Sequence, residues 1–87
     1  MLKENCLLVG TVFKLYGYKG EVNIYNDNDV AINFSELKYF LIDFDNNLVP
    51  FFISSISQKK TNIILVKFEN IDSEDSAKKI YKRDVYL

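Results

Sequence analysis

Residues 10–22 read Gly10-Thr11-Val12-Phe13-Lys14-Leu15-Tyr16-Gly17-Tyr18-Lys19-Gly20-Glu21-Val22. The pattern predicts a strand, a tight turn with two glycines, and a second strand. Glycine adopts positive φ readily and lets other backbone approach closely, so Gly17 and Gly20 mark a specific turn shape. The turn displays two cations and two aromatic rings, from Lys14, Tyr16, Tyr18 and Lys19. A rigid tip of this kind suits contact with a large polyanionic or mixed surface.

The segments on either side of this hairpin predict further strands. Apolar, β-branched or alternating patterns indicate strands at 7–13, 21–25, 39–44, 48–57 and 63–68, with 84–87 extended again. Polar turns are expected at 26–29, 45–47 and 58–62, and residues 30–37 are ambiguous, being compatible with one helical turn. Pro50 has no N–H to donate, so we expect it at an edge or a bulge.

One helix is expected late in the chain, over residues 73–81. Asp72 is a natural N-cap, acidic residues occupy the first turn, and lysines follow at the end, which complements the helix dipole. Ala77, Ile80 and Tyr81 would share the face that packs on the strands. Five or six short strands with one short C-terminal helix predict a mostly all-β protein, a small six-stranded β-barrel, closed or nearly so.

Length and composition predict one domain, residues 1–87, and we expect it to be a monomer. The hydrophobic fraction of 48%, with seven Phe and six Tyr, supports a real core rather than disorder. The formal net charge is −1, so any contact with nucleic acid must be local or shared with a protein. Cys6 is the single cysteine and is expected in the core. One cysteine, no signal peptide and no segment of transmembrane length predict a cytoplasmic protein without a membrane partner.

The chain offers little for catalysis. It has no histidine, which removes a histidine-based triad, histidine metal ligation and the usual proton shuttle. A lone cysteine without a histidine partner is a poor nucleophile, zinc would lack ligands, and no phosphate-binding glycine loop is present. We therefore expect no enzyme activity, no cofactor, no metal and no small-molecule substrate.

The motif in residues 10–22 resembles the N-terminal domain of the RimM family of ribosome maturation factors. The resemblance rests on Gly10, Val12, Lys14, Tyr16, Gly17, Lys19, Gly20, Glu21 and Val22, and on the order of the later segments 37–42, 63–69 and 73–87. Leu15 stands where a proline is common in the family, and Tyr16 where a histidine is common. Asn70 and Lys82 stand where the family often has glycine.

The resemblance implies a β-barrel of the translation-factor and reductase type, followed in the parent protein by a second barrel of the PRC type. It implies a non-catalytic factor that assists late assembly of the small (30S) ribosomal subunit and processing of its rRNA. The implied partners are a ribosomal protein and rRNA near the subunit head. The residues expected to bind are Lys14, Tyr16, Gly17, Tyr18, Lys19, Gly20 and Glu21.

Other interpretations stay open from the residues alone. Gly17 and Gly20 are equally compatible with a plain hairpin turn, and the two tyrosines with ordinary strand aromatics. Lys59 and Lys60 are interpreted as a solvated turn. The alternative functions are an accessory barrel of a flavin-dependent reductase and a barrel that binds only proteins.

Overall fold

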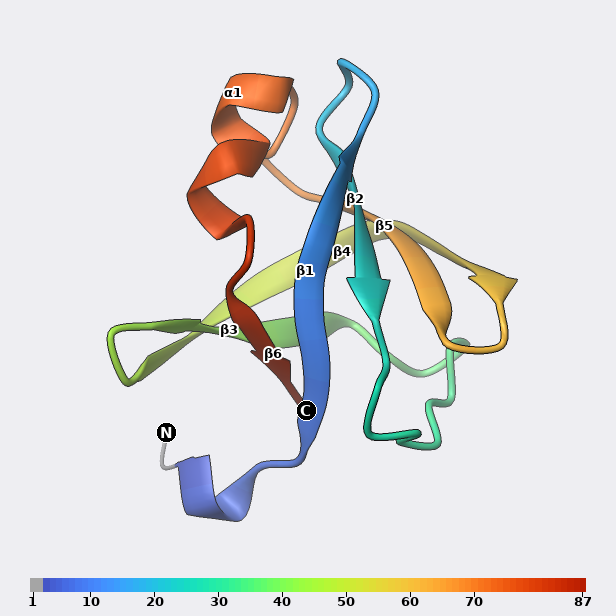
Figure 1. Ribbon diagram of the computed structural model, residues 1–87, viewed down its shortest axis with the longest axis vertical. Helices are drawn as coiled ribbons and strands as arrows, with labels where there is room; N and C mark the ends of the chain where they lie inside the picture. Colours follow the sequence, from blue (N-terminus) through green and yellow to red (C-terminus); the bar gives the residue numbers. More distant parts are fainter. Residues whose placement is uncertain (1–2) are drawn as a thin grey trace.

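A computed structural model of the chain describes residues 3–87, and within this range six antiparallel strands close into a barrel (Figure 1). The order around the barrel is β1-β2-β5-β4-β3-β6. The strands are β1 (Leu8–Tyr16), β2 (Glu21–Tyr25), β3 (Tyr39–Phe44), β4 (Asn47–Lys60), β5 (Ile63–Phe68) and β6 (Asp84–Tyr86). A 3₁₀ turn η1 (Lys3–Asn5) comes first, and α1 (Glu74–Ala77) continues into a 3₁₀ turn η2 (Lys78–Ile80). The predicted fold class is confirmed, while Met1 and Leu2 of the predicted domain lie outside the described residues.

The core follows from alternation along the strands. In β2, Val22 and Ile24 are fully buried, and they pair with Val66 and Ile64 of β5, whose side chains face the same interior. The aromatic ring of Phe68 meets those of Phe40 and Phe51 edge-on within the same core, at centroid distances of 6.4 and 5.8 Å. Each apolar side chain of this size contributes about 1.5–3 kcal/mol when fully buried.

The helix lies where the sequence predicts it, but it is shorter and its cap differs. Ser73 rather than Asp72 is the N-cap: its hydroxyl accepts from the Ser76 N–H, and the Ser76 hydroxyl accepts from the Ser73 N–H. Asp72 instead accepts a hydrogen bond from Lys67 Nζ at 2.8 Å. Ala77 is buried against the barrel as expected. Tyr81, expected on the same face, lies past the end of η2 and is exposed, so that prediction is wrong.

Several strand boundaries differ from the prediction. β1 continues to Tyr16, and β4 continues to Lys60, so Lys59 and Lys60 belong to a strand and not to a turn. Cys6 is only partly buried, whereas a core position was predicted. The expected edge position of Pro50 is confirmed. Pro50 pairs with β3, but β5 pairs with β4 only from Ile53 onward, so β4 has a neighbouring strand on only one side at Pro50.

Left-handed backbone appears where the sequence places turn residues. Asp45 and Asn46 have φ of 52° and 74° and form the two-residue loop that joins β3 to β4. Asn70 and Lys82 also have positive φ, 67° and 63°. Glycine adopts this geometry without the crowding that a Cβ brings, so glycine would fit the backbone at both positions.

Candidate nucleic-acid and partner interface

The β1–β2 hairpin projects beyond the barrel, beside α1, at the top of Figure 1. Tyr16 and Glu21 are the last paired residues, and residues 17–20 form the turn between them. Tyr18 at the tip has 77% of its surface exposed, and Lys19 Nζ lies 5.9 Å from the centroid of its ring. Among the described residues, the Glu21 side chain makes no hydrogen bond or ion pair. The tip therefore presents a ring and a cation to solvent.

The two turn glycines differ in their surroundings. Gly17 has φ of +70°, and a Cβ placed there would meet nothing within 4 Å. Gly20 has φ of +90°, and a Cβ there would collide with the carbonyl oxygen of Ile71 and lie 3.0 Å from the Ser73 nitrogen. Gly20 therefore lets the segment leading into α1 pack against the hairpin. It is an architectural residue, whereas Gly17 only shapes the exposed turn.

A bulge in β1 turns Lys14 and Tyr16 outward. Val12 faces the core opposite Ile24, but the next paired residue is Lys14, opposite Asn23, so Phe13 is the extra residue. Strict alternation from Val12 would send Lys14 and Tyr16 into the barrel. The bulge shifts the phase by one residue, so Lys14 and Tyr16 are exposed, and Leu15 packs against the core instead.

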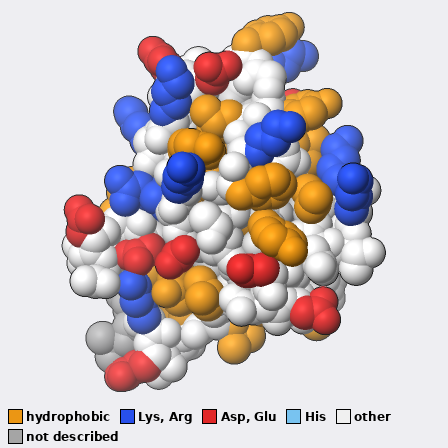
Figure 2. Space-filling view, in the orientation of Figure 1, with side chains coloured by type: hydrophobic (Ala, Val, Ile, Leu, Met, Phe, Trp, Pro, Cys, Tyr) orange, Lys and Arg blue, Asp and Glu red, His pale blue; other side chains and the backbone are white. Residues whose placement is uncertain are grey.

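These outward side chains border a groove on the outer face of β1, β2, β5 and the end of β4, here named the outer groove. It consists of two adjoining hollows of about 390 and 440 Å³, which share Phe13, Lys60 and Ile63. The remaining lining residues are Lys14, Tyr16, Asn23 and Lys59 in the first hollow, and Tyr25, Thr61 and Asn62 in the second. Figure 2 shows hydrophobic side chains gathered over β1 and β2, with lysine or arginine side chains to both sides.

Two sets of side chains dominate this groove. The groove rings are Phe13, Tyr16 and Tyr25, which are 36%, 49% and 44% exposed. The groove lysines are Lys14, Lys59 and Lys60. No acidic residue lines either hollow, and among residues 3–87 the groove lysines form no ion pair. The site thus combines unpaired positive charge with exposed aromatic surface.

Sequence reasoning found only part of this site. It identified Lys14 and Tyr16, which the structure places at the groove edge, and Tyr18 and Lys19, which lie at the tip. It missed Tyr25, Lys59 and Lys60, because the strands that carry them are separated from β1 in the chain. It also missed Phe13, because the bulge in β1 depends on pairing with β2. The alternation of β2 contained a signal: with Val22 and Ile24 inside, Tyr25 has to face outward.

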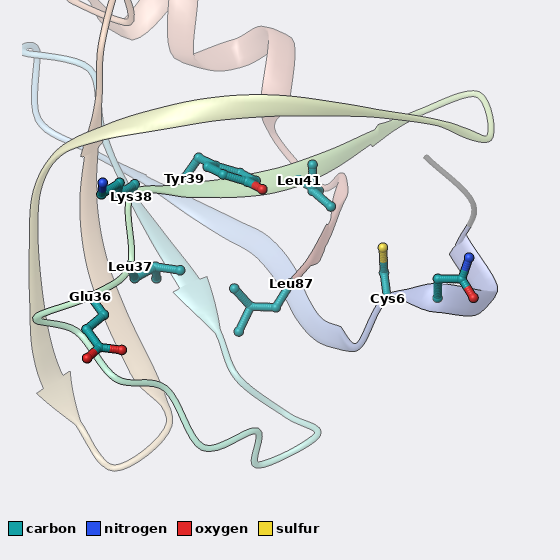
Figure 3. Close-up of a pocket in the computed structure, with 8 residues that line it drawn as sticks. Cys6, Glu36, Leu37, Lys38, Tyr39, Leu41 and Leu87 are labelled. Atoms are coloured by element: carbon teal, nitrogen blue, oxygen red, sulfur yellow. The ribbon is translucent and has the colours of Figure 1, made fainter.

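A hollow separate from the outer groove lies at the end of the barrel that holds the two termini, away from the hairpin tip (Figures 1 and 3). It measures about 350 Å³ and is lined mainly by apolar side chains, among them Cys6, Leu37, Leu41 and Leu87. Leu7 and Leu87 exchange backbone hydrogen bonds of 2.9 Å beside it. Its polar lining residues are Asn5, Glu36, Lys38 and Tyr39.

The perturbed titratable groups of the described chain lie away from the outer groove. Lys3 Nζ and Asp43 Oδ2 are 2.7 Å apart and join η1 to β3. The hydrogen bond from Lys3 lowers the pKa of the Asp43 carboxyl, and the same bond raises the pKa of Lys3. Within residues 3–87, no group of three or more His, Cys, Asp or Glu side chains is placed to hold a metal ion. No helix in that range is long and apolar enough to cross a membrane.

Comparison with known proteins identifies relatives over nearly the whole chain. Residues 7–87 match the family model described as the RimM N-terminal domain. The chain is 37% identical over 87 residues to the ribosome maturation factor RimM of Flavobacterium psychrophilum and 36% identical to that of Christiangramia forsetii. In both cases the match covers 100% of this chain and 50% of the relative, so the chain spans about half the length of these proteins.

A solved structure shares the fold. A crystal structure from Pseudomonas aeruginosa, named for 16S ribosomal RNA processing and RimM, superimposes with a TM-score of 0.76 at 16% identity. The match covers 94% of this chain and 49% of that one.

Proposed function

Since the chain belongs to the RimM family, as its N-terminal domain, we propose that it is a non-catalytic binding module that assists late assembly of the small ribosomal subunit and processing of its rRNA. Its partners in this proposal are a ribosomal protein and rRNA near the subunit head, met as a monomer in the cytoplasm. The relative from Flavobacterium psychrophilum is named a ribosome maturation factor, which supports the role. The PRC-type barrel expected after this domain stays a prediction.

The proposal is supported by the unpaired lysines and exposed rings that the β1–β2 hairpin displays along β1 and at its tip. Lys14 and Lys19 are exposed, and we assign them to phosphate contact. Tyr16 and Tyr18 offer rings and hydroxyls for stacking or hydrogen bonding. Gly17 leaves the tip open to close approach, because no atom lies within 4 Å of where its Cβ would be.

The mechanism in this proposal is selective holding. A rigid surface that binds one RNA–protein arrangement better than its competitors shifts the population toward that arrangement. The size of the shift is set by the difference between the surface's affinity for that arrangement and its affinity for the competing ones. The closed barrel suits this role, because its backbone pairing leaves the hairpin firmly anchored at the base. No chemical step is required of the protein.

Co-sedimentation of the 87-residue chain with small-subunit precursors, and with large subunits as the reference, tests the function. We expect selective binding to the precursors. Lys14→Ala with Lys19→Ala should weaken it and flatten its dependence on salt by roughly one unit of slope per lost phosphate contact. Lys78→Ala with Lys79→Ala removes the same charge from η2 and should leave the slope unchanged.

Three outcomes would contradict the proposal. Equal binding to both subunits would remove the selectivity on which the role depends. A flavin absorption band in the purified chain would instead support the reductase accessory barrel. If only a ribosomal protein and no rRNA-containing particle binds, the protein-only alternative is supported.

A further inference from the structure

The outer groove combines three lysines with three exposed aromatic rings, and membership of the family does not by itself explain this combination. We propose that it binds a single-stranded RNA segment, whose bases stack on the groove rings while its phosphates meet the groove lysines. This inference rests on the proposed function and deepens it, because it names the form of RNA and a surface that extends well beyond the hairpin tip.

Charge favours RNA over a protein occupant. The groove lysines come from two segments far apart in the sequence, β1 and the end of β4, yet they line one hollow without an acidic neighbour in the lining. The whole chain has a net charge of −1, so this is a local concentration of positive charge on a slightly acidic domain. A polyanion gains from such a patch by counterion release.

The rings favour a single strand over a duplex. Phe13 and Tyr25 meet edge-on, with centroids 5.9 Å apart and planes 65° from one another, so each keeps open surface at the groove. A base stacked on a protein ring contributes about 1–3 kcal/mol, measured by alanine substitution. A duplex already stacks its bases internally and presents mainly phosphates and sugars, whereas single strands expose base faces. Exposed rings therefore add affinity only for the single strand.

Fluorescence anisotropy with a labelled single-stranded RNA of about ten nucleotides tests the inference, with a duplex of the same sequence as reference. Phe13→Leu with Tyr25→Leu removes two groove rings but keeps the surface apolar. We expect a loss of affinity of at least about thirtyfold, which corresponds to the lower end for two lost stacking contacts. Circular dichroism verifies that the variant is folded.

The barrel offers a matched control on its other side. Tyr39 and Phe52 also form an exposed edge-on pair, with centroids 5.5 Å apart. Tyr39→Leu with Phe52→Leu should leave RNA affinity unchanged. Lys59→Gln with Lys60→Gln should lower the salt slope by about 0.7 for each phosphate contact, the value for single strands.

The results separate this inference from the proposed function. It is overturned if no RNA binds at about 10⁻⁴ M protein, where even nonspecific binding is usually visible, or if the duplex binds as tightly. It is also overturned if both ring variants behave alike, or if the groove variant loses only a ribosomal protein. Selective co-sedimentation with small-subunit precursors would survive each of these results, whereas failure of the proposed function would abolish it.

Discussion

Replacing Gly20 with alanine tests whether the second turn glycine serves architecture or contact. The change adds one Cβ at a φ of +90°, where it would collide with the Ile71 carbonyl oxygen at the entry to α1. Gly17→Ala is the matched control, because it adds the same atom at a φ of +70° into open space. Both variants place an alanine in left-handed backbone, which costs stability, but only Gly20→Ala also disturbs packed backbone.

The magnitudes follow from these two terms. A left-handed L-residue costs about 1–2 kcal/mol, and this applies to both variants. Forcing an atom into a packed contact adds about 1–3 kcal/mol, and this applies to Gly20→Ala alone. We therefore expect Gly20→Ala to lose about 2–5 kcal/mol of unfolding free energy and Gly17→Ala about 1–2 kcal/mol. For a domain of this size each kcal/mol corresponds to a shift of about 4–8 °C in Tm.

Urea unfolding followed by far-UV circular dichroism measures both losses, and tyrosine fluorescence gives a second probe because the chain has six Tyr and no Trp. Coincident transitions establish two-state behaviour, which the comparison of free energies requires. If the two variants differ by less than about 0.5 kcal/mol, within the usual scatter of surface changes, the close packing of residues 71–73 against the hairpin is not an energetic constraint. In that case Gly20 would again be a candidate residue for contact with the partner, as expected from the sequence.

Three further changes test other parts of the structure. Lys82→Gly should raise Tm, because relief of about 1–2 kcal/mol at a φ of 63° exceeds the entropic cost of about 0.5–1 kcal/mol for glycine; a thermal melt with an unchanged or lower Tm would contradict this. Ser73→Ala should cost about 1 kcal/mol in urea unfolding as the N-cap, and Asp72→Ala clearly less; equal losses would restore Asp72 as the cap. The folded-state pKa of Asp43 is lowered by Lys3, so its contribution to stability is present above the ordinary carboxyl pKa and is lost as the pH falls through the folded-state pKa. The difference in Tm between wild type and Asp43→Asn should shrink over that acidic range, and a constant difference would show that the ion pair is not its source.

Residue patterns were sufficient to predict the elements whose signal is local. Apolar, β-branched or alternating patterns predicted β2, β3 and β5. The turn at Asp45 and Asn46 followed from the tolerance of these side chains for left-handed backbone. The late helix was predicted from its polar start and its lysine-rich end. The N-cap was assigned one residue early, because Asp72 and Ser73 are equally good caps by type and only the direction of the backbone separates them.

The composition of the interface depends on tertiary structure. The bulge at Phe13 decides that Lys14 and Tyr16 face solvent, and a bulge arises from pairing with β2, which no local pattern in β1 reveals. Lys59 and Lys60 join Lys14 because the closed barrel brings β4 to β5, and β5 to β2, on one curved outer face. The same long-range packing distinguishes Gly20 from Gly17, since the atoms that exclude a Cβ at Gly20 belong to residues about fifty positions further along the chain. Local preference thus determined which residues form strands and turns, while strand pairing and barrel closure determined which side chains meet, because those contacts join segments that are distant in sequence.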